Sequence, residues 1–356
     1  MTSVSRSRRP TVRDVASEAG VSVASVSRVL AGAAKPVSEP TRRKVLDAAD
    51  LLGYSVNAVA RSLATGRTGT VGLIVPDLGN QYFTTVAQSI VHAAREDGFE
   101  VLVGDSLNAS DAEPDLARRA MYRTDGLIMC SPRSDTEELG DLTTDGTPMV
   151  MVNRRVPAAP ALSTVYTDVL GATRALVEHL VAGGHTSIAF VGASIASEHA
   201  QARWRLIEEL AVTAGLRAWQ APLETDGPDP DRTMRPLLAA GCTGILAFND
   251  LQAAAVLRVL ADIGVRVPDD VSVVGFDDTP LARWLQPRLT TASMHEREVG
   301  RAAWRAMHAL LIDPGDVSHV EFTAEVVLRD SVAPAPAGVT GRAPAPTERG
   351  HPTTRS

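Results

Sequence analysis

The first apolar residues of the chain recur with the spacing of short amphipathic helices. Thr11 is placed to cap a helix over 12–19, and Gly20 ends that helix. Ser22 is placed to cap a second helix, and a third helix is predicted over 38–52. The positions expected to face a shared core are Val15, Ala16, Ala19, Val26, Val29, Leu30, Val45, Leu46, Ala49 and Leu52. The first two helices and their small-residue turn have the layout of a helix-turn-helix, whose second helix can enter the major groove of DNA.

Beyond residue 69 the pattern changes to short apolar strands that alternate with amphipathic helices. The series runs from TVGLIVP and VAQSIVHAAREDG to PMVMVN at 148–153, and the same rhythm repeats after VYTD at 165–168, from ATRALVEHLVAGGH to VSVVGFDD. Such alternation predicts parallel, doubly wound sheets. The expected fold is therefore a small all-α helix-turn-helix domain followed by an α/β body of two doubly wound parallel-sheet lobes.

Charge is distributed unevenly along the 356 residues, which carry a net charge of −7. Residues 1–66 hold ten Lys and Arg against five acidic residues, so this segment is +5 and the remainder is −12. A small basic domain on a larger acidic body suits contact with DNA phosphates. An ordinary solvated surface gives the same asymmetry, and capped short helices also occur in purely structural bundles.

Several classes of protein are disfavoured by what the sequence contains. Cys130 and Cys242 lie far apart in apolar contexts without metal-ligand spacing, which indicates buried, reduced thiols. We find no apolar run of membrane-spanning length, and the N-terminus lacks a secretion signal, so a cytoplasmic protein is expected and a secreted sugar-binding transport protein is not. An enzyme would need a reactive constellation, and the common phosphate-loop, nucleophile and metal motifs are missing. We therefore predict no catalytic residue, no metal and no cofactor.

Ordered motifs over residues 11–331 resemble the LacI/GalR family of bacterial transcription regulators. They are DVAxxAGVSxAxVSRVL, LGYxxNxxARSLxTGRT, GLIVPDxxNxYF, HLVxxGHxxIAFVG, AFNDxxAAxxLRxLxxxGxRVPxDVSVVGFDD and PRLTT. The resemblance implies a periplasmic-binding-protein-like sensor body and a homodimer. It also implies repression of a carbohydrate-utilisation operon under the control of a small sugar or related metabolite. The residues themselves do not say whether the ligand releases the protein from DNA, which is the behaviour implied by the resemblance, or recruits it.

The resemblance assigns DNA reading to the start of the second helix. Val23 and Ala24 are expected to touch thymine methyl groups, and Arg28 to hydrogen-bond to guanine, while Ser22 and Ser27 hold phosphates. Thr11, at the start of the first helix, completes the set of DNA-contacting residues predicted in this domain.

A short helix at about 57–64 looks like the family's hinge, which folds against its dimer mate in the minor groove. Leu63 would be the wedge between base steps, with Asn57 and Arg61 as phosphate or groove contacts. Unstacking costs least at flexible pyrimidine–purine steps, so a palindromic operator with a C–G centre is expected. The alternative is that Leu63 only anchors a linker. Two copies are needed because one helix-turn-helix reads only a short half-site.

Polar and aromatic residues follow the strands of both lobes, where ligands bind in open α/β sheets. They suit a small polyhydroxylated ligand, since planar polar groups pair with adjacent hydroxyls and aromatic rings stack on sugar rings. The predicted ligand contacts that follow strands are Tyr82, Phe83, Asn153, Asn249 and Asp277. The family resemblance supports all of these except Tyr82, and it alone implies a further contact, Arg205. The alternative is that strand-end Asn and Asp only cap helices. This sequence also departs from the family at Val169, Glu208 and Glu209, so no relative's ligand can be transferred, and Trp284 is left between closing the cleft and packing.

The predicted domain limits follow from these assignments. A basic flexible arm covers 1–10, the helix-turn-helix domain 11–56, and the hinge with its linker 57–68. The two-lobed body covers 69–331, with one lobe at 69–164 plus 294–322 and the other at 165–293 plus 323–331. Residues 332–356 are rich in Pro, Ala, Gly and Thr without apolar periodicity, which predicts a disordered tail and no tetramerising heptads.

Overall fold

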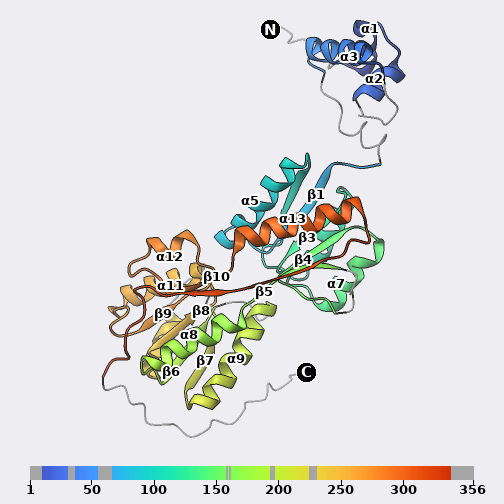
Figure 1. Cartoon of the computed structure of the whole chain (residues 1–356). Helices are drawn as coiled ribbons and strands as arrows, with labels where there is room; N and C mark the ends of the chain where they lie inside the picture. The colour runs from blue at the N-terminus through green and yellow to red at the C-terminus, as the bar shows by residue number, and fades with distance from the viewer. Residues whose placement is uncertain are drawn as a thin grey trace, which may run out of the picture.

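The computed structural model of the chain describes residues 10–30, 37–54, 66–157, 159, 162–192, 197–223 and 231–337. Within these ranges it contains an N-terminal group of three helices and an α/β body of two lobes (Figure 1). The predicted fold class is confirmed. No helix in the described part of the chain is both long enough and apolar enough to cross a membrane.

The N-terminal helices are α1 (Val12–Ala19), α2 (Val23–Leu30) and α3 (Glu39–Leu52). Their shared core is centred on Val15, Val26 and Val45, each fully buried. The prediction for Leu46 was wrong, because its side chain is 42% exposed and Ala48 is buried in its place. Three short helices can bury only a narrow stripe, and a small residue at 48 allows α3 to approach its neighbours closely.

The first lobe is built on a parallel sheet in the order β11-β5-β4-β3-β1-β2. Apolar side chains from the two faces of this sheet belong to two separate clusters. One lies beneath α6 and α7, and the other lies beneath α5 and α13 and continues into the second lobe. The elements are β1 (Thr70–Val75), α5 (Gln81–Glu96), β2 (Glu100–Asp105), α6 (Glu113–Met121), β3 (Leu127–Cys130), α7 (Thr136–Leu142), η1 (Thr143–Asp145), β4 (Met149–Val152), β5 (Ser163–Asp168), α13 (Glu296–Ile312) and β11 (His319–Thr323).

The second lobe has a parallel sheet in the order β7-β6-β8-β9. Its elements are α8 (Leu170–Ala182), β6 (Ser187–Val191), α9 (Glu198–Ala214), β7 (Arg217–Ala221), α10 (Asp231–Ala239), β8 (Gly244–Ala247), α11 (Asp250–Asp262), β9 (Ser272–Val274) and α12 (Pro280–Trp284). Both cysteines are buried, Cys130 in the first lobe and Cys242 in the second, and burial raises the pKa of each thiol to about 12.

The chain passes between the lobes at sites that differ slightly from the predicted limits. Strand β5 lies wholly within the first sheet, so the first crossing follows Asp168 rather than residue 164. Near the later crossings, β10 (Thr291–Ser293) pairs antiparallel with β12 (Glu325–Val327). The predicted limits had cut through β5, whose residues pair with β4 on one side and with β11 on the other.

Residues 332–337, predicted to begin a disordered tail, instead lie on the second lobe. The Ala333 carbonyl accepts hydrogen bonds from Ser272 Oγ at 3.2 Å and from His185 Nε2 at 3.1 Å, and Ala335 N donates to Gly183 O at 2.8 Å. The His185 side chain is buried. Burial lowers its pKa, so the ring acts here as a neutral tether for the chain. Residues 338–356 lie outside the described ranges.

Candidate functional site

The exposed face of α2 carries the residues predicted to read DNA. Ser22, Val23, Ala24, Ser27 and Arg28 are all exposed, while Val26 on the opposite face is buried in the core. Ser22 Oγ accepts a hydrogen bond from Ser25 N at 3.1 Å, which begins the helix, and Arg28 Nε donates to Ala24 O at 3.2 Å. One small, polar and cationic surface is thus available to a partner outside the helices.

Thr11 lies at the other end of this unit and caps α1. Its Oγ1 accepts from Asp14 N at 3.4 Å, and its own N–H donates to Asp14 Oδ2 at 2.7 Å, which forms a capping box. The predicted hinge residues Asn57, Arg61 and Leu63 lie outside the described residues.

On the side of the first lobe, a chain of buried hydrogen bonds links the predicted ligand residues. Asn153 Nδ2 donates to the Tyr82 hydroxyl oxygen at 2.7 Å, and Asn153 Oδ1 accepts from Thr167 N at 2.9 Å. Phe83 packs edge to face on Tyr82, with ring centroids 5.2 Å apart. Burial, and then the nearby Asp277, raise the pKa of Tyr82 well above its ordinary value, so its hydroxyl keeps its proton. The side chains of Tyr82 and Asn153 therefore hold one another in fixed positions.

On the side of the second lobe, the structure brings Arg203 rather than Arg205 to this region. Arg205 lies on the exposed face of α9, whereas Arg203 is only 2% exposed. Two residues along a helix turn the side chain by about 200°, which separates the two arginines onto opposite faces. Arg203 Nη1 donates to Phe248 O at 2.7 Å, and its guanidinium lies 3.8 Å from the centre of the Phe276 ring. Counted from Arg203, the buried Leu206 and Ile207 stand three and four residues on and share its face.

Asp277, predicted as a ligand contact, is buried beside a second carboxylate. Asp250 accepts hydrogen bonds from Thr279 N at 2.7 Å and from Thr291 Oγ1 at 2.6 Å. Burial and then Asp250 raise the pKa of Asp277 well above its ordinary value, and Arg203 opposes this effect. Burial likewise raises the pKa of Asp250 to about 7. Two buried carboxyl groups this close favour keeping a proton on one of them.

Asn249 caps a helix, which was the alternative to ligand binding that the sequence left open. Its Oδ1 accepts a hydrogen bond from Gln252 N at 2.8 Å at the start of α11. This bond uses the oxygen of the side-chain amide and leaves Nδ2 as a donor. A helix cap and a ligand contact are thus compatible at this position.

Buried polar atoms without a hydrogen-bond partner gather where the two lobes meet. In the described part of the chain such atoms are Arg154 Nε, Thr167 Oγ1, His199 Nε2, Arg203 Nε and Gln252 Oε1, together with Ser187 Oγ at the opposite, N-terminal end of β6. Arg154 Nε makes no hydrogen bond but lies 3.7 Å from a carboxylate oxygen of Glu198. In the first lobe, Arg154 lies just beyond β4 and Thr167 lies at the end of β5, and in the second lobe His199, Arg203 and Gln252 lie in the first two turns of α9 and α11. Leaving such groups unpaired costs about 1–3 kcal/mol each, so their concentration in one place indicates positions that a bound molecule would satisfy.

None of these residues is among the predicted ligand contacts, although the sequence places Arg154 directly after a strand. His199 precedes Arg203 by one helical turn on α9, and this spacing was the signal that could have found it. Burial, and then the nearby Arg203 and Arg133, lower the pKa of His199 to about 3. Arg154 lies 3.7 Å from Glu198 across the lobes, which joins the end of β4 to the start of α9.

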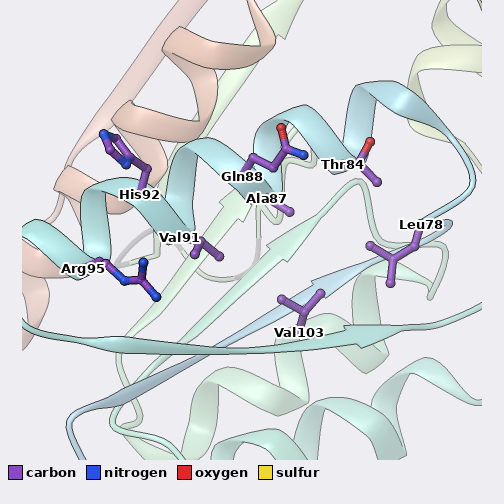
Figure 2. Close-up of a pocket in the computed structure, with 8 residues that line it drawn as sticks. All are labelled: Leu78, Thr84, Ala87, Gln88, Val91, His92, Arg95 and Val103. Carbon is purple, nitrogen blue, oxygen red and sulfur yellow. The ribbon is translucent and has the colours of Figure 1, made fainter.

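A separate apolar groove lies on the outer face of the first lobe, between α5 and the edge strand β2. Figure 2 shows Val91, Ala87 and Arg95 on the helix opposite Leu78 and Val103. The groove encloses about 510 Å³ and its lining is mostly apolar. On the second lobe, Trp284 at the end of α12 is 75% exposed and so does not close the cleft. Exposed apolar groups such as those of the groove and Trp284 mark surfaces that bind other molecules.

Comparison with known proteins agrees with this arrangement. Residues 11–57 match the family model described as bacterial regulatory proteins, lacI family, and residues 177–332 match a periplasmic binding protein-like domain. The HTH-type transcriptional regulator GalS of Salmonella typhimurium is 35% identical over 287 residues, which cover 79% of this chain and 84% of GalS.

Two solved structures show the same architecture. A lac repressor dimer bound to operator and the anti-inducer ONPF matches with a TM-score of 0.79 and 25% identity, over 92% of this chain and 100% of that one. A complex of the transcriptional regulator CelR with cellobiose matches with a TM-score of 0.65 and 27% identity, over 91% of this chain and 100% of that one. These relatives are transcription regulators and not enzymes. The match extends over both the helix-turn-helix and the two-lobed body, and the chain belongs to the LacI family of bacterial transcription regulators.

Proposed function

We propose that this regulator is a homodimeric repressor of a carbohydrate-utilisation operon, released from its operator by a small sugar or related metabolite bound between the lobes. The observation that carries the proposal is the group of buried, unpartnered polar atoms between the lobes. These atoms lie beside aromatic rings, among them Phe276 against Arg203. Polar groups that pair with hydroxyls next to rings that cover apolar faces suit a sugar. The CelR complex with cellobiose supports the same class of ligand.

The roles of the DNA-contacting residues complete the proposal. Val23, Ala24 and Arg28 project from the exposed face of α2 and read base edges, while Ser22 and Ser27 contact phosphates. Leu63, flanked by Asn57 and Arg61, is the wedge at a C–G centre of a palindrome.

The ligand set is Tyr82, Phe83, Asn153, Asn249 and Asp277, with Arg203 in the place first predicted for Arg205. Tyr82, held by Asn153, and Asp277 come from opposite lobes, so a molecule that contacts both favours closed lobes. Binding that changes the relation of the lobes changes the spacing of the paired N-terminal domains, which links the two sites.

In this proposal, the second copy of the chain packs on the apolar groove between α5 and β2. Val91 and Val103 are exposed there, and Leu78 extends the same surface. Covering these side chains removes apolar area from water, and a two-fold pair presents the same surface from both copies. Trp284 on the second lobe supplies a further exposed apolar side chain for the same purpose.

Selection from random DNA duplexes tests the proposal directly. The purified chain is incubated at fixed salt with the pool, and the retained duplexes are sequenced with and without cellobiose, lactose, galactose and ribose. Enrichment of a palindrome with a C–G centre that a sugar abolishes supports the assignment of DNA reading and release by a sugar. No enrichment under any condition contradicts the assignment of DNA reading, and enrichment only in the presence of a sugar contradicts release.

A further inference from the structure

The chain that leads from the helix-turn-helix enters the body through a set of hydrogen bonds centred on one carboxylate. Asp125, at the start of β3, accepts from Thr68 N at 2.7 Å, from Thr68 Oγ1 at 2.9 Å and from Gly69 N at 2.8 Å. Its own N–H donates to Thr70 O at 2.7 Å. Hydrogen bonds to a charged acceptor are stronger than neutral ones, so this point of entry is firmly fixed.

The residue just before this group is tied to a different element. Arg67 Nη2 donates to Leu311 O at 2.9 Å, in the last turn of α13. Carbonyl groups in the last turn of a helix lack partners within the helix, and a cation there is favoured by the helix dipole. The start of the body is therefore joined to the C-terminal end of α13.

The opposite end of α13 lies at the cleft between the lobes. Asp277 and Ser293 form a backbone bridge, and Met294 N donates to Asp277 O at 3.4 Å just before the helix begins. Glu296, in the first turn, is close enough to raise the pKa of both Tyr82 and Asp277. The 17 residues of α13 span about 25 Å, and Figure 1 shows the helix running from β10 to the upper end of β1.

Between its two ends α13 is closely packed against its neighbours. A Cβ atom added at Gly300 would lie 2.6 Å from Ser89 Cβ and 2.7 Å from Val86 O on α5. A Cβ atom added at Gly126, next to Asp125, would lie 2.5 Å from Met307 Sδ. There is thus no space for even one more carbon atom at these two positions. Because α13 has so little room to shift relative to its neighbours, a displacement at one end moves the whole helix.

We propose that Arg67 and Asp125 are positioning residues for the chain that leads from the DNA-binding domain: Arg67 fastens this chain to the C-terminal end of α13, and Asp125 fastens it to the segment just before β3. Movement of the lobes at the Asp277 end of α13 is thereby passed to that chain. The inference rests on the proposed function, since it names the contacts through which the effector site and the DNA-binding domains are coupled. Without these contacts the chain no longer leaves the body in a fixed direction. The two DNA-binding domains of a dimer would then lose more conformational freedom on binding one operator, which weakens binding.

The test uses the full-length protein and the duplex that the wild-type chain selects. Arg67→Ala and Asp125→Asn are each expected to weaken binding to this duplex about tenfold, within the range typical of coupling between sites. Arg67→Lys keeps a cation and a donor and should lie between the alanine variant and the wild type. The matched control is Arg301→Ala, an exposed arginine of α13 paired only with Glu298 among the described residues.

Two further measurements separate coupling from a loss of folding. Hydrogen exchange should be faster at the amides of Thr68 and Gly69 in the Asp125 variant, while the melting temperature of the body stays near that of the control. The inference is overturned if exchange becomes faster and the duplex is still bound within about twofold of wild type. It also fails, together with the proposed function, if the wild-type chain selects no duplex. Failure of the variants alone leaves the proposed function standing.

Discussion

Replacing Gly300 with alanine tests the close packing of α13 against α5. A Cβ atom at this position would lie 2.6 Å from Ser89 Cβ and 2.7 Å from Val86 O, whereas carbon atoms normally approach to about 3.5–4.0 Å. Neither neighbouring atom can turn aside by a change of rotamer, because one is a Cβ atom and the other a backbone carbonyl. The two helices must therefore move apart by about 1 Å.

The expected magnitude combines two opposing effects. Overpacking of this kind costs about 1–3 kcal/mol, and the clash with two helix atoms places it at the upper end. Alanine in a helix interior is favoured over glycine by about 1 kcal/mol, which offsets part of this cost. The free energy of unfolding should fall by about 2 kcal/mol, which lowers the melting temperature by about 4–8 °C in a domain of this size.

Differential scanning calorimetry of Gly300→Ala measures this change, with Gly171→Ala as the matched control. Gly171 lies in α8 and is exposed, and a Cβ atom there would meet nothing within 4 Å. The control should therefore gain about 0.5–1 kcal/mol from helix propensity and the reduced freedom of the unfolded chain. If Gly300→Ala is as stable as the wild type, or is stabilised like the control, then the packing argument for α13 is wrong.

The remaining predictions concern the cleft, the groove and pH. Arg203→Met should abolish the effect of an active sugar on operator binding, while Arg205→Met leaves it intact. Titration of the selected duplex with each sugar measures this effect, and equal effects of the two substitutions would contradict the assignment of Arg203 as the ligand contact. Val91→Glu places a charge in the groove between α5 and β2 and should convert dimers to monomers in sedimentation experiments, whereas an unchanged mass would place the interface elsewhere. The pKa of His199 is about 3 in the folded protein and about 6.5 when unfolded, so the folded state binds fewer protons at mildly acidic pH and stability falls as pH drops below 6.5. His199→Gln should remove up to about 1.4 kcal/mol of this loss per pH unit, measured by urea unfolding at pH 7 and 5, and identical pH profiles would show that His199 is not the titrating group.

Most of the fold could be predicted because its signals are local. The helices around Val15 and Val26 follow from apolar spacing and caps within a few residues, and each apolar strand of the body stands between recognisable helices. Strand β7 has the sequence RAWQA, which lacks such a signal and forms because it pairs with β6. The tail segment at Ala333 was missed for a similar reason, since distant residues hold its backbone and leave no local pattern.

The cleft was predicted less well, because its geometry depends on helix phase and on contacts between the lobes. Arg205 was chosen from a motif, although the apolar positions Leu206 and Ile207 already placed Arg203 on the buried face of α9. The pairing of Asn153 with Tyr82 joins residues 71 positions apart, and spacing along the chain cannot reveal such a bond.

The indole nitrogen of Trp304 on α13 donates to Asp97 at 2.7 Å, 207 residues earlier in the chain. During synthesis at about 5–20 residues per second, the first lobe waits roughly 10–40 seconds for the helix that covers one face of its sheet. Over that interval the α5 side of the lobe presents an unfinished apolar surface, while the sheet of the second lobe and the helices around it are made. Premature termination just before α13 would leave a nascent product that chaperones and proteases recognise, even though most of its strands are present.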